Sequence, residues 1–355
     1  MFGEMTSVEE LARRFSAFGH ESANRAPLYS SLSDGVANDV SSLELMLHAP
    51  TEQHSPVLLF AAVHYLLLDG RRHDLGGFYP NLSSDHRPPA DAYPVFKRFV
   101  NEHAGELVGL LSTRSTQTNE VGRCAFFLPP LGMLHAELGA LALVDIGTSA
   151  GLNQLLTKYS YEYQPGGPVG ERSTVHLECR IRGEIALPRQ LPTVATTIGL
   201  DAAPIDVADA DAVRWLEACV WPDQPERFAR LQAAVALALD NPPTVLRGDA
   251  VDDLAPTVQA VGDQGHPVVL NSWVLSYLSE ARQRDYVAAL DRIGSERDLS
   301  WVVAESPAQT PGLPIPTTTE PEHITVLSMV TWRAGTRTVR RLGTCHPHGL
   351  RIHAG

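Results

Sequence analysis

Apolar residues recur at helical spacing through the N-terminal part of the chain. Val8, Leu11 and Phe15 fall on one face of a helix, and the same spacing continues to about Leu111. The pattern predicts an all-helical region. Between residues 69 and 94, Gly, Pro, Asp and His are frequent, which predicts a long surface loop inside that region.

From Leu141 onward, short apolar runs alternate with helical patterns, which is typical of a parallel α/β sheet. The stretch from Ile324 to Leu342 alternates like an antiparallel hairpin, with Ala334 and Gly335 at its turn. Residues 160–193 interrupt the alternation and are treated as an insertion. The predicted strands are Leu141–Ile146, Thr196–Asp201, Thr244–Arg247, Pro267–Leu270, Ser300–Ala304 and, in the insertion, Val175–Arg182; the predicted helices are Gly151–Tyr159, Glu226–Leu239 and Glu280–Ile293.

The string LALVDIGTSAGLN at residues 141–153 predicts a strand, a glycine-rich turn and the start of a helix. Gly147, Ser149 and Gly151 lie where the chain must reverse sharply, and small residues there let a ligand approach the backbone. The free N–H groups of a following helix favour a polar ligand. The dinucleotide fingerprint GxGxxG fits this string least, because Ser149 and Leu152 stand where its later glycines belong.

The residues GTSAG in this turn also match the GxSxG nucleophile elbow of α/β-hydrolases. Ser149 would then be the nucleophile of an esterase. An acid such as Asp249 and a histidine, His346 or His348, follow it in the chain order that such enzymes use. This interpretation gives no role to Asp145, two residues before the first glycine.

A third interpretation includes Asp145. The string hhDxGxxxG resembles motif I of the class I S-adenosylmethionine-dependent methyltransferases, in which the turn wraps the methionine moiety and the ribose of the cofactor. IGLDAAP resembles the second-strand motif of that family, whose acid, here Asp201, would bind both ribose hydroxyls. VLRGDA resembles the third-strand motif, in which Asp249 would receive the adenine amino group and the backbone near Ala250 would complete the contact. Because Asp201 lies beyond the insertion, Glu178 in the inserted strand is a rival for the ribose.

The fourth predicted strand continues into NSWVLSYL, which resembles the methyltransferase segment that faces the transferred methyl group. The resemblance implies that Asn271 and Trp273 lie beside the cofactor, with Asn153 after the first turn. Core packing is the alternative role for Trp273.

Ahead of the first strand lies the polar string QTNEVGR, residues 117–123. Thr118 and Asn119 are good N-cap residues, so the string could simply start a helix. The alternative is functional: Asn119, Glu120 and Arg123 would lie beside the cofactor, where Glu120 is also a candidate catalytic residue.

The C-terminal string CHPHG offers His346 and His348 as general bases, since methylation of a hydroxyl is helped by a group that removes its proton. Two histidines could also bind a metal, but the sequence indicates no third ligand. An ordinary polar terminus is the remaining alternative.

Composition limits the classes of partner. The chain has 355 residues, 44% of them hydrophobic, and its net charge of −13 opposes nucleic-acid binding, which needs clustered Lys and Arg. The longest apolar run, Pro56–Leu68, is shorter than the roughly 20 residues that span a bilayer. The N-terminus lacks a secretory pattern, and the four cysteines are scattered without CxxC pairing. We therefore expect a cytoplasmic protein with no metal site, no nucleic-acid partner and no membrane partner.

The whole chain also resembles an actinobacterial family known as domain of unknown function 2332, through the strings AAVHYLLL, QTNEVGRC, GTSAGLN, VWPDQPER, RGDA and HPHG. Together these resemblances imply a class I methyltransferase with an α/β, Rossmann-like sheet. A helical cap domain at residues 1–125 would help shape the acceptor pocket, and residues 126–355 would bind the cofactor. We expect S-adenosyl-L-methionine as cofactor and O-methylation of a small molecule or a saccharide. A serine esterase using Ser149 and a non-catalytic cofactor- or partner-binding protein stay open as alternatives, as does the oligomeric state.

Overall fold

The computed structural model describes residues 7–316 and 324–355, and the chain divides into two compact units. The first comprises the chain up to Thr118 together with Ala208–Gln232, and the second comprises Asn119–Val207 and Ala233–Gly355. This division differs from the predicted boundary at residues 125 and 126. The later segment belongs to the first unit because Trp215 is buried in that unit's hydrophobic core.

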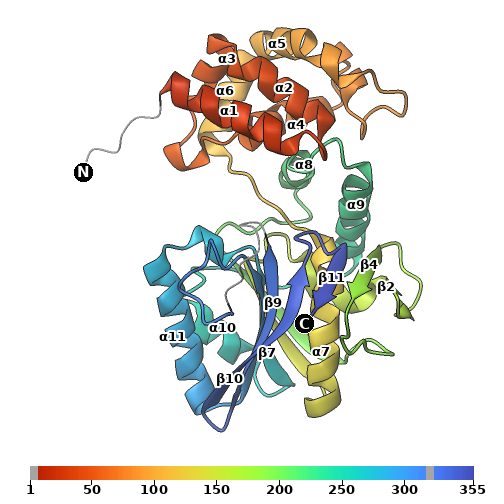
Figure 1. The fold of residues 1–355 in the computed structure, drawn as a ribbon, viewed down its shortest axis with the longest axis vertical. Helices are drawn as coiled ribbons and strands as arrows, with labels where there is room; N and C mark the ends of the chain where they lie inside the picture. The colour runs from red at the N-terminus through yellow and green to blue at the C-terminus, as the bar shows by residue number, and fades with distance from the viewer. Residues whose placement is uncertain (1–6, 317–323) are drawn as a thin grey trace. The chain divides into compact units, whose positions relative to one another are not determined.

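The first unit is helical, as the spacing of its apolar residues predicts. Ser7 caps α1 by accepting a hydrogen bond from the backbone N–H of Glu10. Residues 69–91 form the predicted loop, which contains two short 3-10 helices, η2 (Asp74–Phe78) and η3 (Pro89–Asp91). The other helices, shown in Figure 1, are α1 (Val8–Ser22), α2 (Pro27–Ala37), α3 (Val40–Met46), η1 (Thr51–Gln53), α4 (Pro56–Leu68), α5 (Ala92–Glu102), α6 (Ala104–Thr113) and α8 (Ala210–Ala218). The helix α9 (Pro225–Asp240) begins in this unit and ends in the second.

The second unit is built on one eleven-stranded sheet. Five neighbouring strands are parallel and lie in the order β6-β5-β1-β7-β8, which is 3-2-1-4-5 when they are counted along the chain. All five are predicted by the sequence: β1 (Leu141–Ile146), β5 (Val194–Asp201), β6 (Val245–Arg247), β7 (His266–Ser272) and β8 (Leu299–Glu305).

Antiparallel strands continue the sheet beyond β8. The predicted hairpin is confirmed as β9 (Thr325–Arg333) and β10 (Thr336–Cys345), joined at Ala334 and Gly335, and is followed by β11 (Arg351–Ala354). The inserted residues do not interrupt the parallel strands. They form β2 (Ser160–Gln164), β3 (Gly167–Val169) and the predicted strand β4 (His176–Arg182), which extend the sheet from β11 to its far edge.

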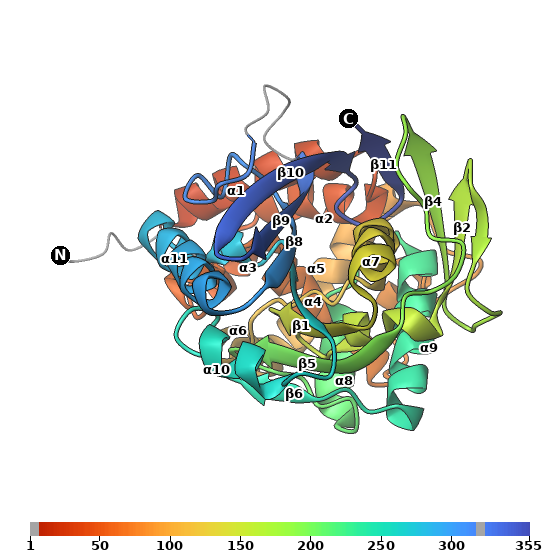
Figure 2. The ribbon, with the colours of Figure 1, turned by 90° about the horizontal axis from the view of Figure 1, so that it is seen from below.

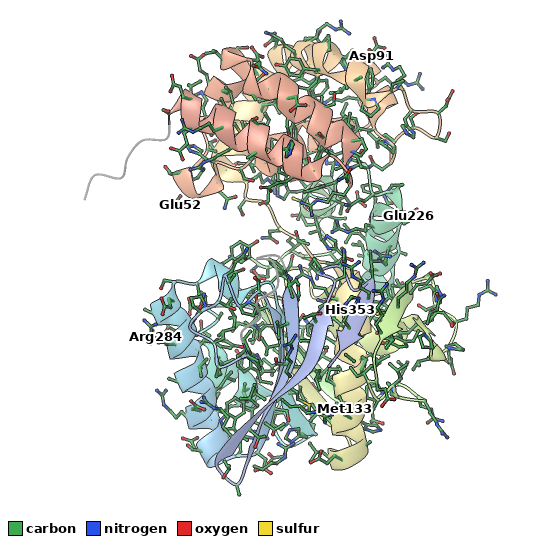
Figure 3. All side chains as sticks on the ribbon, in the orientation of Figure 1. Glu52, Asp91, Met133, Glu226, Arg284 and His353 are labelled. Carbon is green, nitrogen blue, oxygen red and sulfur yellow. The ribbon has the colours of Figure 1, made fainter. Side chains whose placement is uncertain are left out.

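Helices cover both faces of the parallel strands, as Figure 2 shows. Apolar side chains of β1, β7 and β8 pack against α10 (Leu254–Ala260) and α11 (Glu280–Glu296), while α7 (Cys124–Leu138) lies on the opposite face. In Figure 3, Arg284 projects from the outer side of α11, where it is exposed.

No helix among the described residues is both long enough and apolar enough to cross a bilayer. The fold is mixed α/β with a mostly parallel sheet.

Candidate functional site

The carboxyl ends of β1 and β7 form the point at which the strand order changes direction. From β1 the chain adds β5 and β6 on one side, then crosses to β7 and β8 on the other. In open α/β sheets, ligands bind in the crevice at this position because the loops of the two strands diverge there. Polar residues stand at or just past the strand ends: Asp145 on β1, Asp201 on β5, Asp249 after β6, Asn271 on β7 and Glu305 on β8.

The glycine-rich turn after β1 has the left-handed backbone that glycine favours. Gly147 has φ of 70°, Gly151 has φ of 74°, and Ser149 between them has φ of 55°. A Cβ atom at Gly147 would overlap the side chain of Val274, and one at Gly151 would overlap Pro243. Part of the space beside these glycines is therefore filled by side chains of the protein itself and not by a ligand.

The helix predicted at residues 151–159 is present, but in a tighter form than an α-helix. The segment is a 3-10 helix, η5 (Leu152–Lys158), and the backbone N–H of Leu152 donates to Asn119 Oδ1 at 3.2 Å. The first of the N–H groups that were expected to bind a ligand is therefore already bound by Asn119. Asn153 is buried beside Cys124, whose thiol lies 3.4 Å from Asn153 Oδ1.

Asp145 is buried at the end of β1 and is 4% exposed. Burial raises the pKa of its carboxyl to about 7, opposed by a 2.6 Å hydrogen bond from Thr148 Oγ1. The nearby charge of Asp201 adds to the increase, and that of Arg123 opposes it. Asp145 therefore changes its charge near neutral pH.

Asp201 holds the turn from the neighbouring strand. Its Oδ2 accepts the backbone N–H of Ser149 at 2.8 Å, and its Oδ1 accepts that of Ala203 at 2.8 Å. Each carboxylate oxygen has two lone pairs, so both can accept one further hydrogen bond. The rival Glu178 is exposed on β4, which β11, β10, β9, β8, β7 and β1 separate from β5.

Asp249 lies in the turn after β6, followed by the partly buried Ala250. Its Oδ1 accepts the backbone N–H groups of Val251 and Asp252 and pairs with Arg282 at 2.6 Å. The backbone hydrogen bond from Asp252 is the largest influence that lowers the pKa of Asp249, and Arg282 also lowers it. Asp249 therefore presents a stable negative charge at the edge of the parallel strands.

Glu305, which the sequence analysis did not single out, organises the loop after β7. It is fully buried, and its Oε1 accepts the backbone N–H groups of Val274 at 2.9 Å and Leu275 at 3.1 Å. Its third donor is Asn271 Nδ2 at 3.2 Å, and the Oδ1 atom of Asn271 accepts the indole N–H of Trp301. Burial raises the pKa of Glu305 to about 7 despite these bonds.

Trp273 lies in the same loop with φ of 55°, an angle that non-glycine residues rarely adopt. Its indole N–H donates to Thr325 Oγ1 at 2.8 Å, so the ring is fixed from β9. Two buried polar atoms beside it, Ser272 Oγ and Glu305 Oε2, have no hydrogen-bond partner within the described part of the chain. Buried polar atoms are rarely left unpaired, so this pair points to a ligand or an ordered solvent molecule.

The two polar strings at residues 117–123 and 345–349 come together at this end of the sheet. Glu120 Oε2 lies 3.3 Å from His348 Nδ1, and the Arg123 guanidinium donates to Ser272 O at 2.7 Å and to Pro347 O at 3.2 Å. The backbone of Gly122 packs directly on that of Gly349. The predicted catalytic residues Glu120 and His348 are therefore neighbours in space.

The N-cap alternative for Asn119 is not what the structure has, because Asn119 accepts from Leu152 and it is Glu120 that caps the 3-10 helix η4 (Val121–Arg123). His346 Nδ1 accepts the backbone N–H of His348 at 3.1 Å, which leaves its proton on Nε2. Across residues 7–316 and 324–355, no group of three or more His, Cys, Asp and Glu could hold a metal ion.

The chain belongs to a family of uncharacterized proteins conserved in bacteria, domain of unknown function 2332, and the match covers residues 12–353. No curated protein of known function matches the sequence significantly.

Proposed function

With membership of this bacterial family as the premise, we propose that the protein is an S-adenosylmethionine-dependent methyltransferase. Its acceptor is a hydroxyl of a small molecule or a saccharide. The observation that carries the proposal is that Asp145, Asp201 and Asp249 stand at or just past the carboxyl ends of β1, β5 and β6, three adjacent strands. This is the order in which the class I resemblance assigns them to the methionine moiety, the ribose and the adenine.

The residues at these strand ends suit such a cofactor. Both oxygens of Asp201 can accept a further hydrogen bond, which matches the two hydroxyls of a ribose. Asp249 offers an acceptor for an amino group, and Asp145 offers a buried carboxylate for an ammonium. When bound, the cofactor supplies a methyl group on a positively charged sulfur.

Glu120 and His348 are suited to remove the proton of the acceptor hydroxyl. With the carboxylate of Glu120 facing Nδ1, a neutral His348 carries its proton there and keeps Nε2 as the basic nitrogen. The side chain of His348 is 26% exposed, so a substrate can reach it, whereas that of Glu120 is only 4% exposed. In this arrangement His348 is the base and Glu120 orients it.

We place the reaction in the cytoplasm, in keeping with four cysteines that form no disulfide.

The esterase alternative is favoured by one observation, the φ of 55° at Ser149, because nucleophile elbows are strained in this way. Two others oppose it. The acid of the hypothetical triad, Asp249, pairs with Arg282, and His348 lies against Glu120. Labelling of Ser149 by a fluorophosphonate probe, lost in Ser149→Ala, would support the esterase.

Calorimetry of the full chain with S-adenosylmethionine and S-adenosylhomocysteine tests the proposal. We expect both to bind, and Asp201→Ala to weaken binding by about 2–3 kcal/mol, because two hydroxyls lose their acceptor. Glu178→Ala is the matched control and should bind like the wild type, since Glu178 is exposed on a distant strand. Absence of binding to the wild type would overturn the proposal, and weakening by Glu178→Ala alone would overturn the assignment of Asp201.

A further inference from the structure

Glu305 is a buried carboxyl group with one oxygen in use and one unused. Its Oε1 atom takes all three of the hydrogen bonds described above, from Asn271, Val274 and Leu275. Its Oε2 atom has no hydrogen-bond partner in the described residues. The residue is 0% exposed, so water does not solvate the second oxygen from outside. Burying a carboxylate oxygen without a partner costs free energy unless a positive charge or a hydrogen-bond donor lies beside it.

The position of Glu305 places this oxygen near the point where the strand order changes. Glu305 ends β8, next to β7, and holds the N–H of Val274, whose side chain packs on Gly147 of the β1 turn. The unpartnered hydroxyl of Ser272 belongs to the last residue of β7, directly before this loop. The loop after β7 is also the segment that the methyltransferase resemblance assigns to the transferred methyl group.

We propose that Glu305 selects the positively charged sulfonium form of the cofactor over its neutral thioether product. This inference rests on the proposed function. S-adenosylmethionine and S-adenosylhomocysteine differ by one methyl group and one positive charge, so their affinity ratio reports the charge of the site. A carboxylate in a poorly hydrated position attracts a nearby cation strongly, because little water screens the pair. The same preference favours release of the product.

Two groups from other elements interact electrostatically with Glu305. Arg123, ahead of α7, lowers the pKa of Glu305, and Glu305 raises the pKa of the buried Tyr286 on α11, as does Asp145 on β1. Burial raises the pKa of Glu305 to about 7 and that of Asp145 to about 7. Both carboxyls therefore gain negative charge between pH 6 and pH 8, and substitution is needed to separate them.

The test is calorimetry of the full chain with S-adenosylmethionine and with S-adenosylhomocysteine, at pH 6 and at pH 8. Glu305→Gln keeps an oxygen for the N–H groups of Val274 and Leu275 while it removes the charge. At pH 8 we expect the wild type to prefer S-adenosylmethionine, and Glu305→Gln to reduce that preference about tenfold with little change for S-adenosylhomocysteine. Glu178→Gln, which removes an exposed carboxylate on β4, should leave the preference unchanged.

An unchanged preference in Glu305→Gln, with both ligands still bound, would overturn this inference and leave the proposed function standing. If neither ligand binds to the wild type, both this inference and the proposed function are overturned. If Glu305→Gln does not fold, the wild type can still contradict the inference: a preference for S-adenosylmethionine that stays constant from pH 8 to pH 6 would overturn it.

Discussion

Two residues at the candidate site have strained backbone angles. Among the described residues other than glycine, Ser149, Trp273 and Ala334 have φ between 47° and 55°. Ala334 is in the β9–β10 hairpin turn, where such angles are ordinary. Ser149 and Trp273 instead follow β1 and β7, and each costs of order 1–3 kcal/mol that its surroundings must offset. Asp201 fixes Ser149, and Thr325 fixes Trp273. Strain concentrated at one point of the sheet is typical of a binding or catalytic site.

Gly147→Ala should destabilise the second unit by about 2–4 kcal/mol. The substitution adds a Cβ at φ of 70° and drives it into the side chain of Val274. Gly335→Ala is the control, because Gly335 has φ of 76° with open space around it and should cost only about 1 kcal/mol. Denaturant unfolding followed by tryptophan fluorescence measures both. Val274→Ala should recover part of the loss in the double variant, and equal effects of the two glycine substitutions would contradict the steric explanation.

The residues of the site could be predicted from the sequence only where they lie in a recognisable sequence motif. Asp145, Asp201 and Asp249 each lie in such a string, and all three stand at strand ends. Glu305 was missed because WVVAE reads as a buried strand that ends in one acid. The sequence does show an acid at the end of β8, as it does at the end of β5. The role of this acid depends on the loop after β7, whose backbone N–H groups donate to it.

Elements with a strong local pattern were predicted well, and elements defined by long-range pairing were not. The strands β1, β5, β7 and β8 appear within a few residues of their predicted bounds. The segment after Gly151 forms a 3-10 helix and not an α-helix, and its first N–H is bound by Asn119, which lies outside the segment. The inserted strands could not be placed from sequence, since β4 pairs with β11, which follows it by more than 150 residues.

Asp39→Asn should loosen the contact between α3 and α5. Burial opposes ionisation of Asp39, but hydrogen bonds from Lys97, Ser42 and Tyr93 hold its pKa well below the usual value. Because the pKa is lower in the folded state, these bonds stabilise the protein above about pH 4 and lose their effect as the pH falls further. We expect Asp39→Asn to lower the free energy of unfolding by about 1–2 kcal/mol at pH 7 and by less near pH 2. The exposed Asp34→Asn is the control, and a loss independent of pH would contradict the electrostatic explanation.

At the scale of the whole molecule, the connection between two adjacent strands supplies part of the other unit. The chain leaves β5 at Asp201, contributes Ala208–Gln232 to the helical unit and then returns to β6. Trp215 of this segment is buried in the helical core, and its indole N–H donates to Ser115 O at 2.8 Å. The backbone carbonyl of Ala218 bonds to the buried His64. A boundary drawn along the sequence could not include this segment, since its role appears only in contacts made across the chain.

Trp215→Ala should therefore destabilise the helical unit, although Trp215 lies far beyond the first 118 residues. The substitution removes a large side chain that is 3% exposed and packs edge-on against Tyr65, a loss of about 3–5 kcal/mol. Hydrogen exchange resolved by peptide should show faster exchange in α1, α2 and α4, with β1, β7 and β8 unchanged. Tyr277→Ala is the control, because Tyr277 is 84% exposed and its removal leaves no cavity. Faster exchange in the sheet alone would contradict the assignment of residues 208–232 to the helical unit, because their packing would then support the strands.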